Sequence, residues 1–387
     1  MFRAILCVVV SALFALSSTI ALGDVTTPPA PNAASDQNEK AYFKGKAALD
    51  DKNFDKAKEL LLPAAEKGNA NAQNSVGNMY FNGFGVPVDF AKAVDWYQKA
   101  ALQGHSGAQI QLGAMYLIGL GTTAEALKSA ELKGDSAKTS DVKAVAPQTT
   151  EVKSNSAKAV EWYQKAAMQG NAGAQNILGN MYFYGLGIPQ DLTKAVEWYL
   201  KAAELGDANA QAALGNLYLS GQGVLANSAV AADWFQKAAL QGNADAQTKL
   251  GNLFFAGQGV SQDLTKAALW YQRAAERGNA SSQISLGNMY SAGQGLPKDL
   301  FKAAMWYQKA ALQGNADAQN LLGDAYHSGN GISKDLDKAV EWYQKAALQG
   351  NVNAQINLKA TKAEISEVQI LKNSKQSEAK DAGVISE

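Results

Sequence analysis

The chain has 387 residues, enough for one long array or for two to three globular domains of ordinary size. Lysine plus arginine equals aspartate plus glutamate at 35 each, so the formal net charge is zero. This balance excludes the strongly basic surface with which proteins bind nucleic acid or an anionic membrane, and we expect no nucleic-acid partner.

Residues 1–23 are typical of a secretory signal peptide. Arg3 supplies a positive start, residues 4–16 form a mostly apolar run, and the sequence Ala-Leu-Gly at residues 21–23 fits the small-residue rule for cleavage. We therefore expect cleavage after Gly23 and a periplasmic or secreted protein. The apolar run is shorter than the roughly 20 residues of a membrane helix. No second apolar run follows, so we expect no membrane span in the mature chain.

The segment that follows the expected cleavage site is polar and rich in proline, and residues 24–38 are predicted to be a disordered linker. Residues 39–68 resemble a degenerate two-helix unit in which Leu60 stands where later units carry tryptophan. We predict that this unit is a helical hairpin that caps the N-terminal end of an array.

Internal repetition dominates residues 69–363, where we predict seven tandem repeats with a closing helix. The seven tryptophans of the chain share one repeat position and are Trp96, Trp162, Trp198, Trp234, Trp270, Trp306 and Trp342. From Trp162 onward each follows the last by 36 residues, whereas the first interval is longer. An insertion at residues 122–154, rich in Ala, Ser, Thr and Lys and without aromatic residues, is predicted to be disordered, with a short helix at residues 124–132.

Each repeat is predicted to contain two helices, which we call helix A and helix B. Residues 210–218 represent helix A, residues 191–199 represent helix B, and a Gly-x-Gly turn joins each helix A to the helix B after it. Aspartate or asparagine precedes helix B as an N-cap. These expected caps are Asp89, Asn155, Asp191, Asn227, Asp263, Asp299 and Asp335. On the exposed side of helix B, pairs such as Glu197 and Lys201 are predicted to attract each other at i, i+4.

Helix A carries a glycine in its interior, although glycine there costs about 1 kcal/mol relative to alanine. These glycines are Gly77, Gly113, Gly179, Gly215, Gly251, Gly287 and Gly323. We expect them to permit close approach of a helix that carries the bulky tryptophan and tyrosine. One hairpin cannot bury those aromatic rings alone, so stacking of hairpins is predicted.

The array is predicted to end in a polar closing helix that begins at Val352. Lys359 replaces the helix A glycine, and Lys362 replaces the helix A tyrosine. Residues 364–387 are expected to hold the end of this helix, near Lys372, and a flexible tail.

The repeated pattern Ala-x-Ala-Gln-x-x-Leu-Gly-x-x-Tyr-x-x-Gly-x-Gly, then Asp-x-x-Lys-Ala-x-x-Trp-Tyr-x-Lys-Ala-Ala-x-x-Gly, resembles the Sel1-like repeat (SLR) family, a relative of the tetratricopeptide repeat. The resemblance covers residues 69–362. It implies an all-α fold, namely an α-solenoid formed as a right-handed superhelix of two-helix, 36-residue repeats, with helix A on the concave wall. It also implies scaffold or adaptor roles with other proteins as partners, and for exported bacterial relatives a role in the envelope or in host-cell contact.

The sequence contains no arrangement typical of catalysis. His105 and His327 lie in different repeats, without the cysteine or carboxylate spacing of a metal site, and Gly-x-Gly follows a helix instead of a strand. We therefore expect a protein that is not an enzyme, with no catalytic residue, no metal site and no cofactor.

A polar position directly after the helix A glycine is the candidate peptide groove. It is occupied by Asn78, Asn180, Asn216, Asn252, Asn288 and Asp324. An asparagine amide offers both a donor and an acceptor to an extended peptide. Simple solvation of an exposed face explains the same residues equally well, and both interpretations stay open. A recurring glutamine of helix A, such as Gln73, is expected to form hydrogen bonds with backbone groups. The alternative is that these glutamines form a polar row that faces a ligand.

Leu269 and Met305 form a candidate outer patch, because other B helices carry an acidic residue at their position. Two alternatives to a scaffold stay open. Cysteine-rich exported relatives linked to β-lactams suggest an envelope hydrolase or a cell-wall glycan-binding protein, although this chain lacks their paired cysteines. A luminal adaptor of a eukaryotic secretory compartment is the other, although the chain ends without a retention signal.

Overall fold

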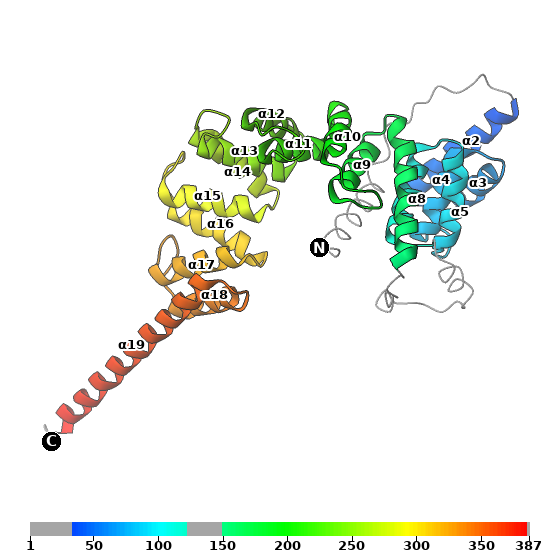
Figure 1. Ribbon diagram of the computed structural model, residues 1–387. Helices are drawn as coiled ribbons and strands as arrows, with labels where there is room; N and C mark the ends of the chain where they lie inside the picture. The colour runs from blue at the N-terminus through cyan, green and yellow to red at the C-terminus, as the bar shows by residue number, and fades with distance from the viewer. Residues whose placement is uncertain (1–32, 122–148, 385–387) are drawn as a thin grey trace. The chain divides into compact units, whose positions relative to one another are not determined.

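The computed structural model describes residues 33–121 and 149–384 (Figure 1). In these residues it contains 17 α-helices and no strand, which confirms the predicted all-α class. The expected signal peptide and the expected helix at 124–132 lie outside the described residues. The chain divides into two compact units, Met1–Ala210 and Gln211–Glu387.

Most helices of the two units have 13 residues, whereas α2, α8 and α19 are longer. In the first unit they are α2 (Ala33–Asp50), α3 (Phe54–Glu66), α4 (Ala70–Asn82), α5 (Phe90–Leu102), α6 (Ser106–Ile118), α8 (Thr149–Met168), α9 (Ala172–Tyr184) and α10 (Leu192–Glu204). The boundary between the units lies in α11 (Ala208–Ser220). In the second unit they are α12 (Ser228–Leu240), α13 (Ala244–Ala256), α14 (Leu264–Glu276), α15 (Ala280–Ala292), α16 (Leu300–Leu312), α17 (Ala316–Ser328), α18 (Leu336–Leu348) and α19 (Val352–Val384).

Successive helices pair as hairpins, and the hairpins stack within each unit. Helices A and B of one repeat are in contact in pairs such as α4 with α5 and α17 with α18, and each helix B also contacts the next helix A, as α16 does α17. This is the arrangement of a helical solenoid, as expected. It buries one row of core residues in each hairpin.

Polar caps define where helix B begins. Asp191 Oδ1 accepts the Lys194 backbone N–H at 3.0 Å, and Asp263 Oδ1 accepts that of Lys266 at 2.9 Å. The predicted cap at Asn155 is wrong, because α8 begins at Thr149 and Asn155 lies inside it. No glycine or proline occurs in α8, so nothing in the sequence stops the helix from extending past the expected start.

Three expected boundaries move for the same reason. Residues 33–38 belong to α2 and not to the linker, and residues 149–154 belong to α8 and not to the loop. Helix α19 continues to Val384, beyond the expected end near Lys372, since no proline and no glycine before Gly383 interrupts it.

The helix A glycine forms a notch for an aromatic ring of helix B in the same hairpin. A Cβ placed on Gly179 would lie 2.7 Å from Cδ1 and Cε1 of Tyr199, and one on Gly77 would lie 2.6 Å from the same atoms of Tyr97. The tyrosine rings are almost completely buried. The expected close approach is therefore confirmed for the tyrosine.

The tryptophan has a different task, which is to join neighbouring hairpins. Trp96 packs against the core that the preceding helix B forms with its own helix A, and Trp306 and Trp342 do the same in the second unit. A cation covers the ring: Lys309 Nζ lies 4.0 Å from the centroid of Trp306. Lys201 likewise lies over Trp198, at 4.1 Å, so the lysine expected to pair with Glu197 contacts the aromatic ring instead.

The recurring glutamine of helix A satisfies backbone groups, as expected. Its Nε2 donates to a carbonyl oxygen in the last turn of the preceding helix B at 2.9–3.2 Å; the glutamines are Gln73, Gln109, Gln175, Gln247, Gln283 and Gln319. A second glutamine, 30 residues later, donates in turn to the first, as Gln103 does to Gln73 Oε1 at 2.7 Å. Where Leu205 or Arg277 replaces that second glutamine, the Oε1 of Gln175 or Gln247 is buried without a partner.

Two glycines of α9 provide a test of the notch. Gly179→Ala would force a methyl group into the Tyr199 ring, and we expect it to lower the free energy of unfolding by about 1–3 kcal/mol. Gly173→Ala in the same helix meets only Asn171 Oδ1 at 3.4 Å. It should be neutral or stabilising by up to about 1 kcal/mol. Urea unfolding of both variants measures the difference, and equal effects would contradict the notch.

The unpaired Gln175 oxygen provides a second test. Leu205→Gln should restore the missing hydrogen bond and raise the free energy of unfolding by about 1 kcal/mol. Gln103→Leu, which removes the equivalent donor from Gln73, should lower it by about 1–3 kcal/mol, since it leaves a buried oxygen unpaired. Chemical denaturation should show that the free energy of unfolding rises in Leu205→Gln and falls in Gln103→Leu. A change of the same sign in both variants would argue against the hydrogen bond between the two glutamines.

Candidate protein-binding surface

The asparagines of the candidate groove are held by the tyrosine of the same hairpin. The hydroxyl of Tyr97 donates to Asn78 Oδ1 at 2.8 Å, and Tyr271 donates to Asn252 Oδ1 at 2.7 Å. The pairs Tyr199–Asn180 and Tyr307–Asn288 have the same geometry, at 2.7 and 2.8 Å. The ring that fills the glycine notch therefore reaches the next residue of helix A with its polar end.

Burial keeps these hydroxyls protonated. It raises the pKa of Tyr271 to about 12 from the ordinary 10.0, and it raises the pKa of Tyr97 and Tyr199 as well. Each tyrosine is therefore a permanent donor at neutral pH. The acceptor oxygen of each paired asparagine is thus already used inside the protein.

The donor side of the same amides is available. In the described part of the chain, the Nδ2 groups of Asn78, Asn180, Asn252 and Asn288 donate to no other group. Asn252 and Asn288 are exposed, and Asn78 and Asn180 are half-buried. Each of these four repeats can therefore offer a peptide one oriented N–H donor, and not the donor and acceptor expected from the sequence.

Two repeats depart from this pattern. Asn216 faces Phe235, which has no hydroxyl, so the exposed Asn216 amide is not oriented by a ring. Ala114 stands at the asparagine position opposite Tyr163, whose pKa is raised by burial.

Asp324 forms a hydrogen bond with the closing helix, α19. Its Oδ1 accepts from the Tyr343 hydroxyl at 2.7 Å and from Asn357 Nδ2 of α19 at 3.0 Å, and its Oδ2 accepts from Asn320 at 3.2 Å. Burial raises the pKa of this carboxyl, while the Tyr343 hydroxyl and the charge of His327 lower it. The structure therefore places Asp324 in a contact between α17 and α19.

Leu269 and Met305 lie on the exposed side of α14 and α16, with 47% and 42% of their surface accessible. Five B helices also expose an apolar residue in their last turn, which the sequence analysis missed. These residues are Leu102, Met168, Leu240, Leu312 and Leu348. Their signal in the sequence was a large apolar residue directly after the Ala-Ala pair, where two other repeats carry glutamate.

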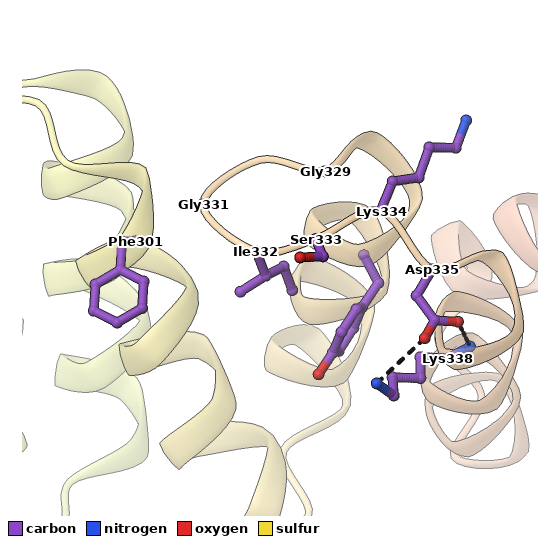
Figure 2. Close-up of a pocket in the computed structure, with 9 residues that line it drawn as sticks. Phe301, Gly329, Gly331, Ile332, Ser333, Lys334, Asp335 and Lys338 are labelled. Atoms are coloured by element: carbon purple, nitrogen blue, oxygen red, sulfur yellow. Dashed lines mark hydrogen bonds and ion pairs between the residues drawn. The ribbon is translucent and has the colours of Figure 1, made fainter.

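Figure 2 shows an open hollow of about 720 Å³ in the second unit, between α16 and the loop from α17 to α18. Phe301 and Ile332 form its apolar side, and Lys338 lies over the ring of Tyr326 at 5.4 Å from the centroid. Asp335, its one carboxylate, caps α18 and pairs with Lys338 at 3.2 Å. These groups suit an apolar contact beside a cation; they do not form an acid–base pair.

The two histidines lie at helix ends in different repeats. His105 caps α6 by accepting the Ala108 N–H at 3.0 Å, and His327 near the end of α17 pairs with Glu364 at 2.8 Å. In the residues that the structure describes, no group of three or more His, Cys, Asp or Glu side chains could hold a metal ion.

Comparison with solved structures gave relatives that extend over most of the chain. One is the crystal structure of c5321, a protective antigen present in uropathogenic Escherichia coli strains and displaying an SLR fold, with 35% identity and a TM-score of 0.71; the match covers 85% of this chain and 65% of that one. Another is a Sel1 repeat protein from Oxalobacter formigenes, with 31% identity, a TM-score of 0.62 and coverage of 91% and 99%. This chain thus spans only 65% of the length of the E. coli protein. A comparison with curated protein sequences gave no significant match.

The Sel1 repeat family model matches nine segments of the chain. They are residues 40–69, 70–105, 106–132, 149–171, 172–207, 208–243, 244–279, 280–315 and 316–351. The first is the degenerate N-terminal hairpin, and the third and fourth are the halves of the repeat that the insertion interrupts. These matches and the stacked hairpins agree, and the chain belongs to the Sel1 repeat family.

Proposed function

We propose that this protein is a scaffold that binds an extended segment of another protein along the exposed face of its A helices. Sel1 repeat proteins are generally non-catalytic scaffolds for protein interactions. The observation that supports the peptide mode is the pair of asparagine Nδ2 donors in the second unit, Asn252 of α13 and Asn288 of α15, each oriented by a buried tyrosine. Asn78 and Asn180 have the same geometry in the first unit.

The spacing of these donors suits an extended backbone. Neighbouring A helices are linked directly, as by the hydrogen bond between Thr248 of α13 and Ser282 of α15 at 2.7 Å. Packed helices lie about 8–10 Å apart, and an extended chain rises about 3.3 Å per residue. The donors of Asn252 and Asn288, which lie in neighbouring repeats, would therefore meet carbonyl groups about three residues apart in a bound peptide.

A hydrolase or a cell-wall glycan-binding protein is the alternative function. Among the described residues, no group of three or more His, Cys, Asp or Glu side chains could hold a metal ion, and the one carboxylate of the hollow beside α18 is used as a helix cap. The scaffold therefore remains the proposal.

We also propose that the protein is exported to the periplasm or the cell exterior, with a role in the envelope or in host-cell contact. The proposal is supported by the signal-like composition of residues 1–23. None of the described helices combines the length and the apolar character that crossing a membrane requires.

Export can be tested by the mass of the protein recovered from a bacterial host. We expect a mature chain that begins at Asp24, and we expect Val9→Arg, which places a charge in the apolar run, to leave the precursor uncleaved in the cytoplasm. An intact precursor for the unaltered chain would contradict the proposal.

The groove can be tested with a substitution that keeps the fold. Asn252→Asp and Asn288→Asp together retain an oxygen for the Tyr271 and Tyr307 hydroxyls, as Asp324 does for Tyr343, but remove both Nδ2 donors. We expect the affinity for a partner peptide, identified first by crosslinking in intact cells, to fall about tenfold or more, because a buried carbonyl loses its donor and meets a carboxylate.

The matched control is Asp245→Asn together with Asp317→Asn. It changes the same number of charges near the start of two A helices, away from the asparagine positions of the candidate groove. It should leave the affinity within about twofold, and unfolding curves should show that both double variants are folded. An unchanged affinity in the Asn252→Asp and Asn288→Asp double variant would contradict the proposed peptide groove.

A further inference from the structure

The last helix of the array lacks the partner that every other helix A has. Helix α19 follows α18 at the position of a helix A, but no helix B follows it in the described residues, because α19 itself continues to Val384. Figure 1 shows α19 extending beyond α17 and α18 as a single long helix. One face of α19 is therefore left without the cover that a hairpin normally supplies.

The earlier repeats show what this face is for. In α15, Ala280 and Ile284 pack against the core formed by α16 and α17, and in α17 Ala316 packs against the core of α18. The residues of α19 at the positions of Ala280 and Ile284 are Val352 and Ile356, which are 65% and 62% exposed. Both are large and apolar, although a helix that ended the array in water would need no such residues.

An ordinary helix B does not fit this face. The notch that accepts a tyrosine in α17 is Gly323, where a Cβ would lie 2.6 Å from Tyr343. In α19 the same position is Lys359, whose side chain fills the notch and carries a charge. The occupant must therefore present a carboxylate, and not a tyrosine, opposite Lys359.

The projecting half of α19 meets this requirement. Beyond Lys359 the same helical face continues through Ala363, Glu367 and Ile370, at the i, i+3, i+4 spacing of a packed seam, and all of these residues are exposed. In an antiparallel pair of α19 helices centred on Ala363, Ile356 lies opposite Ile370 of the second copy, and Lys359 lies opposite its Glu367. The small Ala363 residues meet at the crossing point, where they permit close approach.

We propose that two copies of this chain form a symmetric dimer in which the projecting half of each α19 acts as the missing helix B of the other. The antiparallel direction is the one in which helix B runs in every hairpin. Two-fold symmetry supplies each contact twice, so two Ile356–Ile370 contacts and two Lys359–Glu367 ion pairs form. Within one chain Lys359 and Glu367 are eight residues apart, about 12 Å along the helix, and cannot pair with each other.

Charge reversal in the full chain tests the partner. Sedimentation equilibrium should show a dimer for the unaltered protein. Lys359→Glu or Glu367→Lys alone should weaken it about tenfold or more, since like charges then face each other twice. The double variant K359E/E367K should restore the unaltered dissociation constant to within about threefold, because the pair is rebuilt with opposite polarity. Circular dichroism of all variants checks that α19 remains helical.

A cysteine test fixes the register. In a Cys7→Ser background, Ala363→Cys should form an intermolecular disulfide on mild oxidation, because the two positions meet at the symmetry axis. Gln369→Cys is equally exposed on the same helix, but its two copies would lie about 18 Å apart and should stay reduced. The proposal would be overturned by a monomer at all measurable concentrations, by a dimer whose dissociation constant does not respond to either charge reversal, or by growth beyond a dimer. A disulfide at Gln369→Cys would overturn the register of the two helices.

Discussion

Each repeat depends on an aromatic ring, a tyrosine in six repeats and Phe235 in the other, that lies in the notch left by a helical glycine. The glycine costs helix stability, about 1 kcal/mol relative to alanine, yet burial of an aromatic ring recovers more than that. The contact also determines the distance between the two helices, since a Cβ on Gly287 would lie 2.5 Å from the Tyr307 ring. Because the helices approach so closely, the hydroxyl of the ring reaches the far side of helix A. The core of the hairpin thereby orients a polar residue on its surface.

This coupling places the residues of the proposed groove directly beside the residues that pack the hairpin. The position after the glycine varies among Asn, Ala and Asp, and the ring opposite it varies between Tyr and Phe. The notch itself is present in all seven repeats. Variation in the outer pair changes which hydrogen-bonding groups are exposed, while the glycine that accepts the ring is kept. A repeat protein can in this way change its recognition surface one repeat at a time.

The sequence predicts the repeat well because its signals are local and recur. The spacing of Trp162 and Trp198, the Asp191 cap and the glycine turns each follow from short-range chemistry. The extended starts of α2 and α8 could not be predicted from those signals, since the absence of a helix breaker predicts no end point. The pairing of Tyr97 with Asn78 was also out of reach, because it depends on how far a side chain of helix B reaches across the notch. Helical periodicity alone placed Asn78 on the exposed face and left its acceptor unassigned.

The end of the array shows what happens when the notch is lost. Lys359 stands at the glycine position and Lys362 at the tyrosine position, so α19 cannot receive another ordinary helix B. Its inner side is instead held by polar contacts, in which Asn357 donates to Asp324 and Glu364 pairs with His327 and Lys334. Asp324 is the last member of the asparagine row, and here the acceptor that elsewhere serves only the tyrosine also binds the closing helix. The asparagine donors therefore end before α19. The apolar face of α19 stays exposed in the described residues, because no helix B follows to cover it.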